Sequence, residues 1–380
     1  MVNGFISEEF PIHRSAKQGC SISSNLYAIY IEPLALTIQQ EPALKPIPLP
    51  GPPVVIMQIA DDMEIFLSEN ASIKHLFSLF KMFRMATGST INEEKTEGLR
   101  LNSPKWGQPE LEQIIWKNKE GMRVLGIFFF PDFIHTQQHN WTAINNDIKL
   151  DLQRSKAREL SLKGRTLVLN TLVLSKVWYL ATVIAPPPNE SKVLIRAVVD
   201  FFWQLSTREN QCIDPIQRKI LYQPLNKGGM NLKDVDLQVK ALQLKFIKNI
   251  VDPECTHPWV HLARYYIGFR LSKLHPDWTF LAHNTQRRDE TRNITSKFYK
   301  DLIQDTETLD LSKTSWVTPH IYLSLREKDK EVPLVPHCWG SWYGHGANLN
   351  RLFTHVHWTD ARGAHQDVMW KFIHRIVPTN

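Results

Sequence analysis

Two adjacent aspartates, Asp61 and Asp62, separate two short apolar segments and constrain the fold of this chain more than any other feature. The flanking segments, residues 54–60 and 63–67, are rich in aliphatic and β-branched side chains and have the length of strands. Because Asp favours turns, the sequence predicts a β-hairpin with both carboxylates at its tip. Such a pair can bind a divalent metal ion, but an Asp pair in a turn is also commonly only a solvated loop.

Further segments stand in a fixed order around this pair. Arg14 to Ser23 reads RSAKQGCSIS and precedes an apolar helical run at residues 26–34, and the downstream segments are Ala86–Asn92, Lys95–Glu97 and Val124–Ile127. With the aspartate hairpin, they resemble motifs B, C, D and E of reverse transcriptases from non-LTR (LINE-type) retrotransposons. That family has Arg-x-x-x-Gln-Gly-Cys-Pro-x-Ser before a helix and then an aromatic-Ala-Asp-Asp hairpin.

The resemblance extends beyond these motifs with lower specificity. Residues 160–165, 174–179, 201–203 and 224–229 are similar to the segment usually assigned to the thumb of the same enzymes. It therefore covers most of residues 1–250. The resemblance implies an α+β fold, in which a partial right-hand polymerase palm (reverse transcriptase-like) is followed by a mostly α-helical thumb and a C-terminal helical region.

Three domains are predicted from this order and from the hydrophobic periodicity. They are a partial palm at residues 1–135, a helical basic thumb at 141–250 and a C-terminal helical region at 251–380. Helices are predicted at 26–39, 73–87, 141–152, 166–185, 191–204 and 235–250, and the proline-rich segment 42–53 is predicted to be a surface loop. Residues 251–380 contain many His and Trp residues without the spacing of a zinc site, and their end looks like the entry to a cysteine-rich module.

The resemblance also implies roles for individual residues. Asp61 would bind Mg²⁺ (or Mn²⁺), Asp62 would support the same metal site, and Lys95 would donate a proton or positive charge to the departing pyrophosphate. Gln18 and Gly19 would lie beside the incoming nucleotide. The other predicted substrate-binding residues are Arg14, Ala60 and Gly126, and Gly126 is expected to mark a close backbone crossing near the primer grip.

Two of these assignments have a plainer alternative. Gly19 could simply be a loop glycine before a helix, and Lys95, between Glu94 and Glu97, could be a solvated surface lysine.

The family's aromatic residue before Ala-Asp-Asp is Ile59 here, and serines at 21 and 24 replace the motif B prolines. These departures suggest relaxed selection.

A further carboxylate that the family supplies from motif A is not found upstream of Arg14, and the fingers are not recognised either. The expectation is therefore a downstream portion of a larger polymerase, which would be inactive alone. A separate chain that carries the fingers and motif A could complement it.

The positive charge lies in the middle of the chain. The formal net charge is +7, and residues 141–250 contain seventeen Lys and Arg against nine Asp and Glu. A thumb that follows RNA template and DNA primer, or an RNA–DNA duplex, should be basic, because neutralising phosphates supplies affinity independent of sequence. The predicted phosphate contacts are Lys149, Arg154, Lys156, Arg158, Lys163 and Arg165; the alternative is an ordinary solvated helix face.

Cysteine usage and hydropathy predict an intracellular location, nuclear or cytoplasmic. The four cysteines are far apart and form no C-x-x-C pair, which is typical of a reducing compartment. The longest apolar stretch, residues 167–185, contains Asn170 and Lys176 and ends at three prolines, so it predicts a buried helix and no membrane partner.

Two classes of function remain open from the sequence. One is RNA-directed DNA polymerisation by two-metal nucleotidyl transfer, the activity of the family. The other is a non-catalytic remnant that binds nucleic acid through its basic helices, or a pseudogene product without a role.

Overall fold

The computed structural model describes residues 21–101, 114–156, 158–204, 214–284, 296–311, 315–328, 349–358, 362–374 and 376. The chain divides into two compact units. Unit 1 comprises residues 1–97 and 103–115, and unit 2 comprises residues 98–102 and 116–380. Residues 116–135, which the sequence assigned to the palm, thus group with the helices that follow.

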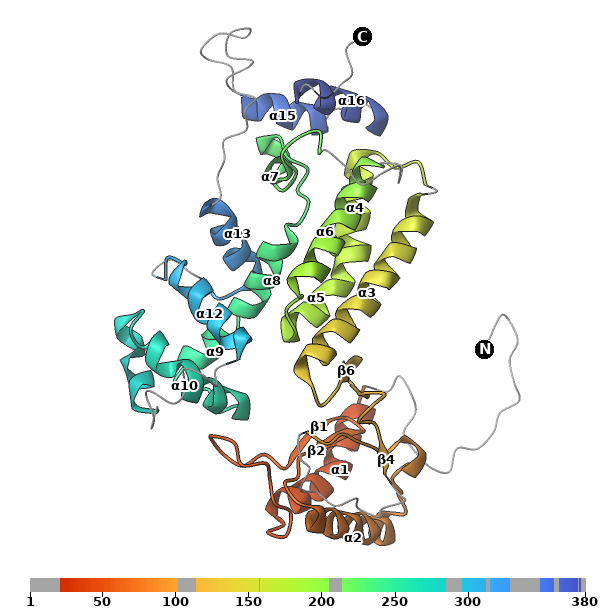
Figure 1. Ribbon diagram of the computed structural model, residues 1–380, viewed down its shortest axis with the longest axis vertical. Coiled ribbons are helices and arrows are strands. Elements are labelled where there is room, and N and C mark those ends of the chain that lie inside the picture. Colours follow the sequence, from red (N-terminus) through yellow and green to blue (C-terminus); the bar gives the residue numbers. More distant parts are fainter. Residues whose placement is uncertain are drawn as a thin grey trace, which may run out of the picture. The chain divides into compact units, whose positions relative to one another are not determined.

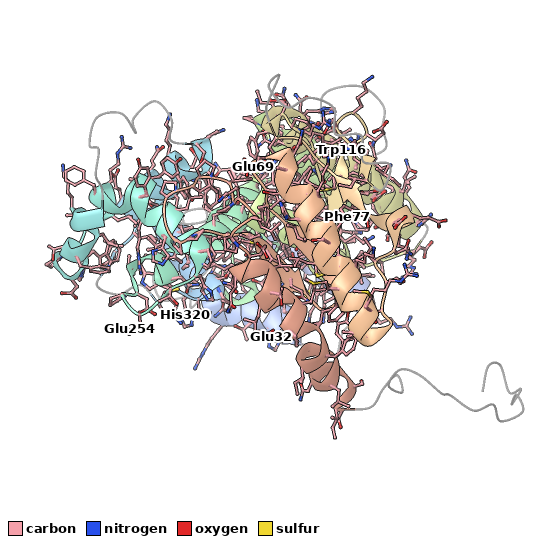
Figure 2. All side chains as sticks on the ribbon, turned by 90° about the horizontal axis from the view of Figure 1, so that it is seen from below. Glu32, Glu69, Phe77, Trp116, Glu254 and His320 are labelled. Atoms are coloured by element: carbon pink, nitrogen blue, oxygen red, sulfur yellow. The ribbon has the colours of Figure 1, made fainter. Side chains whose placement is uncertain are left out.

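Unit 1 contains two long helices and a β-hairpin (Figure 1). Helix α1 (Ser23–Gln40) packs along α2 (Asn70–Thr87), and Figure 2 shows Glu32 on the first and Phe77 on the second. Both helices confirm the predicted ones. Strands β1 (Ile56–Ile59) and β2 (Asp62–Ile65) form an antiparallel hairpin. The buried core of the unit consists of Leu34, Ile38, Leu44, Val55, Leu76 and Leu79.

The proline-rich loop between α1 and β1 has no regular structure, as predicted. It is nevertheless fixed to α2, because the Ser72 hydroxyl accepts from the Lys45 amide at 3.0 Å and donates to the Ala43 carbonyl at 2.8 Å. Beyond α2 come the short 3₁₀ helix η1 (Glu93–Lys95) and strand β3 (Glu97–Gly98), which pairs with β4 (Ile115–Trp116).

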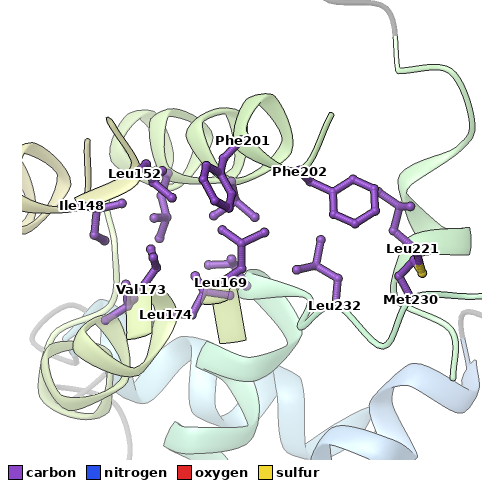
Figure 3. Close-up of a cluster of buried hydrophobic side chains, with 14 of the residues drawn as sticks. Ile148, Leu152, Leu169, Val173, Leu174, Phe201, Phe202, Leu221, Met230 and Leu232 are labelled. Carbon is purple, nitrogen blue, oxygen red and sulfur yellow. The ribbon is translucent and has the colours of Figure 1, made fainter. Parts of the chain in front are cut away.

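The main part of unit 2 is a helical bundle. It contains α3 (Phe133–Lys156), α4 (Leu162–Val168), a π-helical turn η2 (Leu169–Val173), α5 (Leu174–Val183) and α6 (Pro188–Trp203). Figure 3 shows how their apolar faces meet. Ile148, Leu169, Leu174 and Phe202 lie in one core, and each is 0% exposed. Helix α5 ends at Val183, before the three prolines, and Pro188 begins α6, a position that suits proline because the first helical N–H has no partner in the helix.

The predicted helix at residues 166–185 is one long helical stretch in which the π turn interrupts the α-helical hydrogen bonding. Residues 162–183 are long and apolar enough to cross a membrane, but the core helix of a globular protein meets the same criteria of length and composition. Leu169, Val173 and Val177 are buried in the bundle core, whereas Leu167 and Tyr179 are more than half exposed. The helix is therefore buried along one face only.

Two structural blocks follow the bundle. Segments α7 (Arg218–Leu221) and η3 (Leu225–Lys227) lead to a second core, formed by α8 (Val235–Leu244), α9 (Ile247–Val251), α10 (Pro258–Leu271), η4 (Pro276–Asn284), α12 (Lys297–Glu307) and α13 (Thr318–Lys328). Helices α15 (Leu349–Trp358) and α16 (Gly363–Ile373) instead contribute Phe353 and Trp370 to the bundle core. The region predicted as one C-terminal domain thus serves two cores.

Candidate metal site and nucleic-acid interface

The aspartate pair lies at the end of the β1–β2 hairpin, which confirms the predicted hairpin. Ile59 pairs with Asp62, so the loop consists of Ala60 and Asp61 alone. Ala60 has a φ of 54°. A type II′ turn needs a positive φ at its first loop residue, and Gly adopts a positive φ at lower cost than Ala. Both aspartates are exposed.

Charge and burial around the hairpin act on two neighbouring groups. Partial burial raises the pKa of the Glu64 carboxyl, and Asp62 raises it further. Tyr27 on α1 also has a raised pKa, first because of burial and then because the Asp61 charge disfavours a phenolate. The aspartates thus form a local negative field at the hairpin tip.

The donor chemistry of this tip suits a hard cation such as Mg²⁺, because both ligands offer carboxylate oxygens. Asp61 and Asp62 would hold it. Within the described ranges, however, no group of three or more His, Cys, Asp and Glu side chains could hold a metal ion. The described residues therefore bring together two adjacent carboxylates at this candidate site.

The other predicted active-site residues fall in three places. Arg14, Gln18 and Gly19 lie outside the described residues. Lys95 is exposed in η1, within the same compact unit as the aspartates, and no ion pair is formed by its side chain in the described part of the chain. Gly126 lies in unit 2, in the turn between β5 (Met122–Val124) and β6 (Ile127–Phe129).

The interpretation of Gly126 as a close backbone crossing is wrong. A Cβ built at Gly126 would meet nothing within 4 Å. The glycine is needed because both residues of this two-residue turn have positive φ, 46° at Leu125 and 86° at Gly126, as in a type I′ turn. The Tyr179 hydroxyl of α5 donates to the Leu125 carbonyl at 2.6 Å and fixes the turn to the bundle.

Five of the six predicted phosphate contacts have exposed side chains at the junction of α3 and α4. Arg154 pairs weakly with Asp151, at 3.8 Å, whereas the others form no ion pair in the described part of the chain; these are Lys149, Lys156, Arg158 and Lys163. These four exposed cations lie in the last two turns of α3, at Arg158 between the helices and in the first turn of α4.

Arg165 is different, because its guanidinium is bound within the protein. Its Nε donates to the Leu160 carbonyl at 2.9 Å, and Nη1 donates to the Phe202 carbonyl at 2.8 Å. Partial burial lowers its pKa, while Asp367 raises it. Arg165 therefore ties α4 to the end of α6, which disfavours its predicted role as a phosphate contact.

The start of α4 also depends on residues that the sequence did not single out. The Ser161 hydroxyl accepts from the Gly164 amide at 3.2 Å, and the Asp367 carboxylate of α16 accepts from the Leu162 amide at 2.8 Å. The Ser161 cap was readable as Ser before a helical run. The Asp367 contact joins residues 205 apart and has no local signal.

Aromatic side chains of α6 do not form an exposed stacking platform. Phe201 is 1% exposed and Phe202 is 0% exposed, so both belong to the bundle core. The helix thus uses them for packing.

No family model matches the sequence. A Xenopus laevis protein described as "Transposon TX1 uncharacterized 149 kDa protein" is 24% identical to the chain over 266 residues. The match covers 69% of this chain and 20% of that protein, so the chain spans about a fifth of the length of the relative. The similarity indicates an origin related to a transposable element.

Proposed function

We propose that the chain derives from the reverse transcriptase of a non-LTR retrotransposon and contributes to RNA-directed DNA polymerisation by two-metal nucleotidyl transfer. The observation that carries the proposal is the exposed Asp61–Asp62 pair at the tip of a tight β-hairpin. The order of the surrounding motifs and the similarity to a transposon protein support it.

The two aspartates would hold Mg²⁺ or Mn²⁺ through carboxylate oxygens. When bound, such metals stabilise the attacking and leaving oxygens of an in-line displacement. The hairpin would keep both carboxylates adjacent and exposed, so that they do not need to move in order to bind a metal ion. A further carboxylate would come from outside the described residues, for example from a complementing chain.

Primer extension tests this proposal. The purified chain, alone and mixed with a polypeptide that carries the family's fingers and motif A, is given a homopolymer RNA template, a DNA primer and Mg²⁺ or Mn²⁺. Extension that is lost in Asp61→Ala but kept in a matched loop variant, Glu69→Ala, would support it. Extension that survives Asp61→Ala would refute the role of the hairpin.

A second function, duplex binding without catalysis, is favoured by the four exposed cations at the α3–α4 junction. Each phosphate contact that is lost should make the plot of log affinity against log salt concentration shallower by about 0.9. Changing Lys149, Lys156 and Lys163 to Gln should therefore reduce the slope by about 2 to 3. Changing three exposed lysines elsewhere, Lys74, Lys81 and Lys248, is the control.

A further inference from the structure

Two cations in unit 2 lie near one buried tyrosine ring and have no counter-ion among the residues that the structure describes. Lys233 Nζ is 4.4 Å from the centroid of the Tyr322 ring, and the Arg326 guanidinium carbon is 5.8 Å from the same centroid. Tyr322 is 2% exposed, so the ring forms a rigid base for both side chains.

The backbone around Lys233 is fixed from both sides. Its amide donates to the Asn170 side-chain oxygen at 3.1 Å, and the amide of Asp234 donates to the Tyr322 hydroxyl at 3.0 Å. Asn170 lies in the π turn η2, and its amide nitrogen also donates to the Asn231 carbonyl at 2.9 Å. A π turn of this kind often occurs where a helix serves a functional site.

Arg326 lies one helical turn after Tyr322 on α13. Its Nη1 makes one long hydrogen bond, 3.4 Å to the Tyr222 carbonyl. A guanidinium has five N–H donors, so most of its donor capacity is left for another acceptor.

Two other cations of the same unit are neutralised. Arg218 pairs with Asp214 at 2.5 Å, and Lys240 pairs with Asp305 at 2.6 Å. In contrast, neither Lys233 nor Arg326 has a carboxylate within 4.0 Å in the described part of the chain. The neighbouring Asp234 carboxylate accepts from the Leu237 amide and caps α8.

Placing two like charges together in a half-buried position is unfavourable without an anion. Burial lowers the pKa of the Lys233 ammonium, and the nearby charge of Arg326 lowers it further. The protein maintains this arrangement with a fixed backbone at Lys233 and a buried ring that both cations lie near.

We propose that Lys233 and Arg326 form a phosphate-binding site over the Tyr322 ring, and that its ligand is a backbone phosphate of the bound nucleic acid. The ammonium would act as a point charge and the guanidinium as a directional donor, the two modes by which proteins bind phosphate oxygens. The ligand identity depends on the duplex binding proposed above, whereas the affinity for phosphate does not.

The first test measures the affinity of the chain for a 20-base-pair RNA–DNA duplex over a series of salt concentrations. Loss of one phosphate contact should make the slope of Lys233→Gln/Arg326→Gln shallower by about 0.9, whereas Lys227→Gln, an exposed lysine just before the same loop, keeps the slope of the wild type. Equal slopes in the double variant and the wild type would overturn the proposal for nucleic acid.

The second test compares thermal unfolding in sodium phosphate and in sodium chloride at equal ionic strength. Phosphate should raise the melting temperature of the wild type and of Lys227→Gln more than that of the double variant. In chloride the double variant should melt no lower than the wild type. If it melts lower by the same amount in both salts, the cations have only a structural role.

The two tests separate this site from the proposed function. A chain that binds no duplex but shows the phosphate effect has a site for free phosphate, and both duplex binding and the backbone-phosphate ligand are then wrong. If duplex binding does not depend on Lys233 and Arg326, the proposed function stands and the proposed site is wrong. Absence of both effects overturns the site entirely.

Discussion

Replacing Gly229 by Ala should destabilise unit 2 strongly, because this glycine allows two backbone segments to touch. A Cβ at Gly229 would lie 2.0 Å from the Gln223 carbonyl oxygen and 2.4 Å from its carbon. Both are backbone atoms, so no side-chain rotation relieves the overlap. The backbone segment at residues 221–223 must move away.

The magnitude follows from what that movement breaks. Met230 and Leu232 both donate to the Leu221 carbonyl at 3.1 Å. Overpacking costs about 1–3 kcal/mol and each lost hydrogen bond about 1 kcal/mol, so Gly229→Ala should lower the free energy of unfolding by about 3–5 kcal/mol. This is a large fraction of the ~5–15 kcal/mol that stabilises a typical domain.

Urea unfolding followed by tryptophan fluorescence and far-UV circular dichroism measures the loss. The control is Gly164→Ala in α4, where the nearest atom to a new Cβ is 3.5 Å away. That change should stabilise the protein by about 0.5–1 kcal/mol, because Ala has the higher helix propensity. A loss of less than about 1 kcal/mol in Gly229→Ala would refute the argument, because it would show that the loop yields without breaking its hydrogen bonds.

Three further predictions concern other contacts of unit 2. Tyr179→Phe removes the hydrogen bond to Leu125 and should lower the free energy of unfolding by about 0.5–1.5 kcal/mol in urea titrations; no change would mean that water replaces it fully. Burial lowers the pKa of His357 and His374, so the unfolded chain binds protons more readily below about pH 6.5 and stability should fall from pH 7.5 to 5.5. His357→Leu should flatten that pH dependence in urea titrations, and an unchanged slope would contradict it. Arg165→Gln should lower the thermal unfolding temperature without changing the salt dependence of duplex binding, whereas a shallower slope would restore its role as a phosphate contact.

The local sequence pattern was sufficient to predict those elements that residues close together in the sequence form. The β1–β2 hairpin follows from two apolar runs around Asp61 and Asp62, and α1 and α2 follow from their length and periodicity. The buried positions Trp141, Ile148 and Leu152 follow from helical spacing in the same way.

Contacts between distant segments could not be predicted in this way. The net charge of residues 141–250 gave the basic character of the region, but not that Arg165 is bound to carbonyls while Lys163, two residues earlier, is exposed. Likewise, Lys233 and Arg326 are 93 positions apart in sequence, and only the packing of α13 against α8 brings them to one ring. A single sequence records side-chain types, whereas these roles depend on what the fold places beside them.

The loop at residues 228–234 takes part in several of these long-range contacts. Its contribution to stability and its proposed contribution to phosphate binding must therefore be separated by the choice of variant. Trp370 of α16 and His374, just after this helix, both approach the Gly228 carbonyl, at 3.0 and 2.8 Å, while Asn170 contacts the other end of the loop. Glycine is required at 228 because φ is +84°. A backbone change in this loop must therefore alter stability and phosphate binding together, whereas Lys233→Gln changes only a side chain that projects from it. If Gly229→Ala and Lys233→Gln reduced duplex affinity equally while only the first reduced stability, the loop would act on the nucleic acid through Lys233 alone.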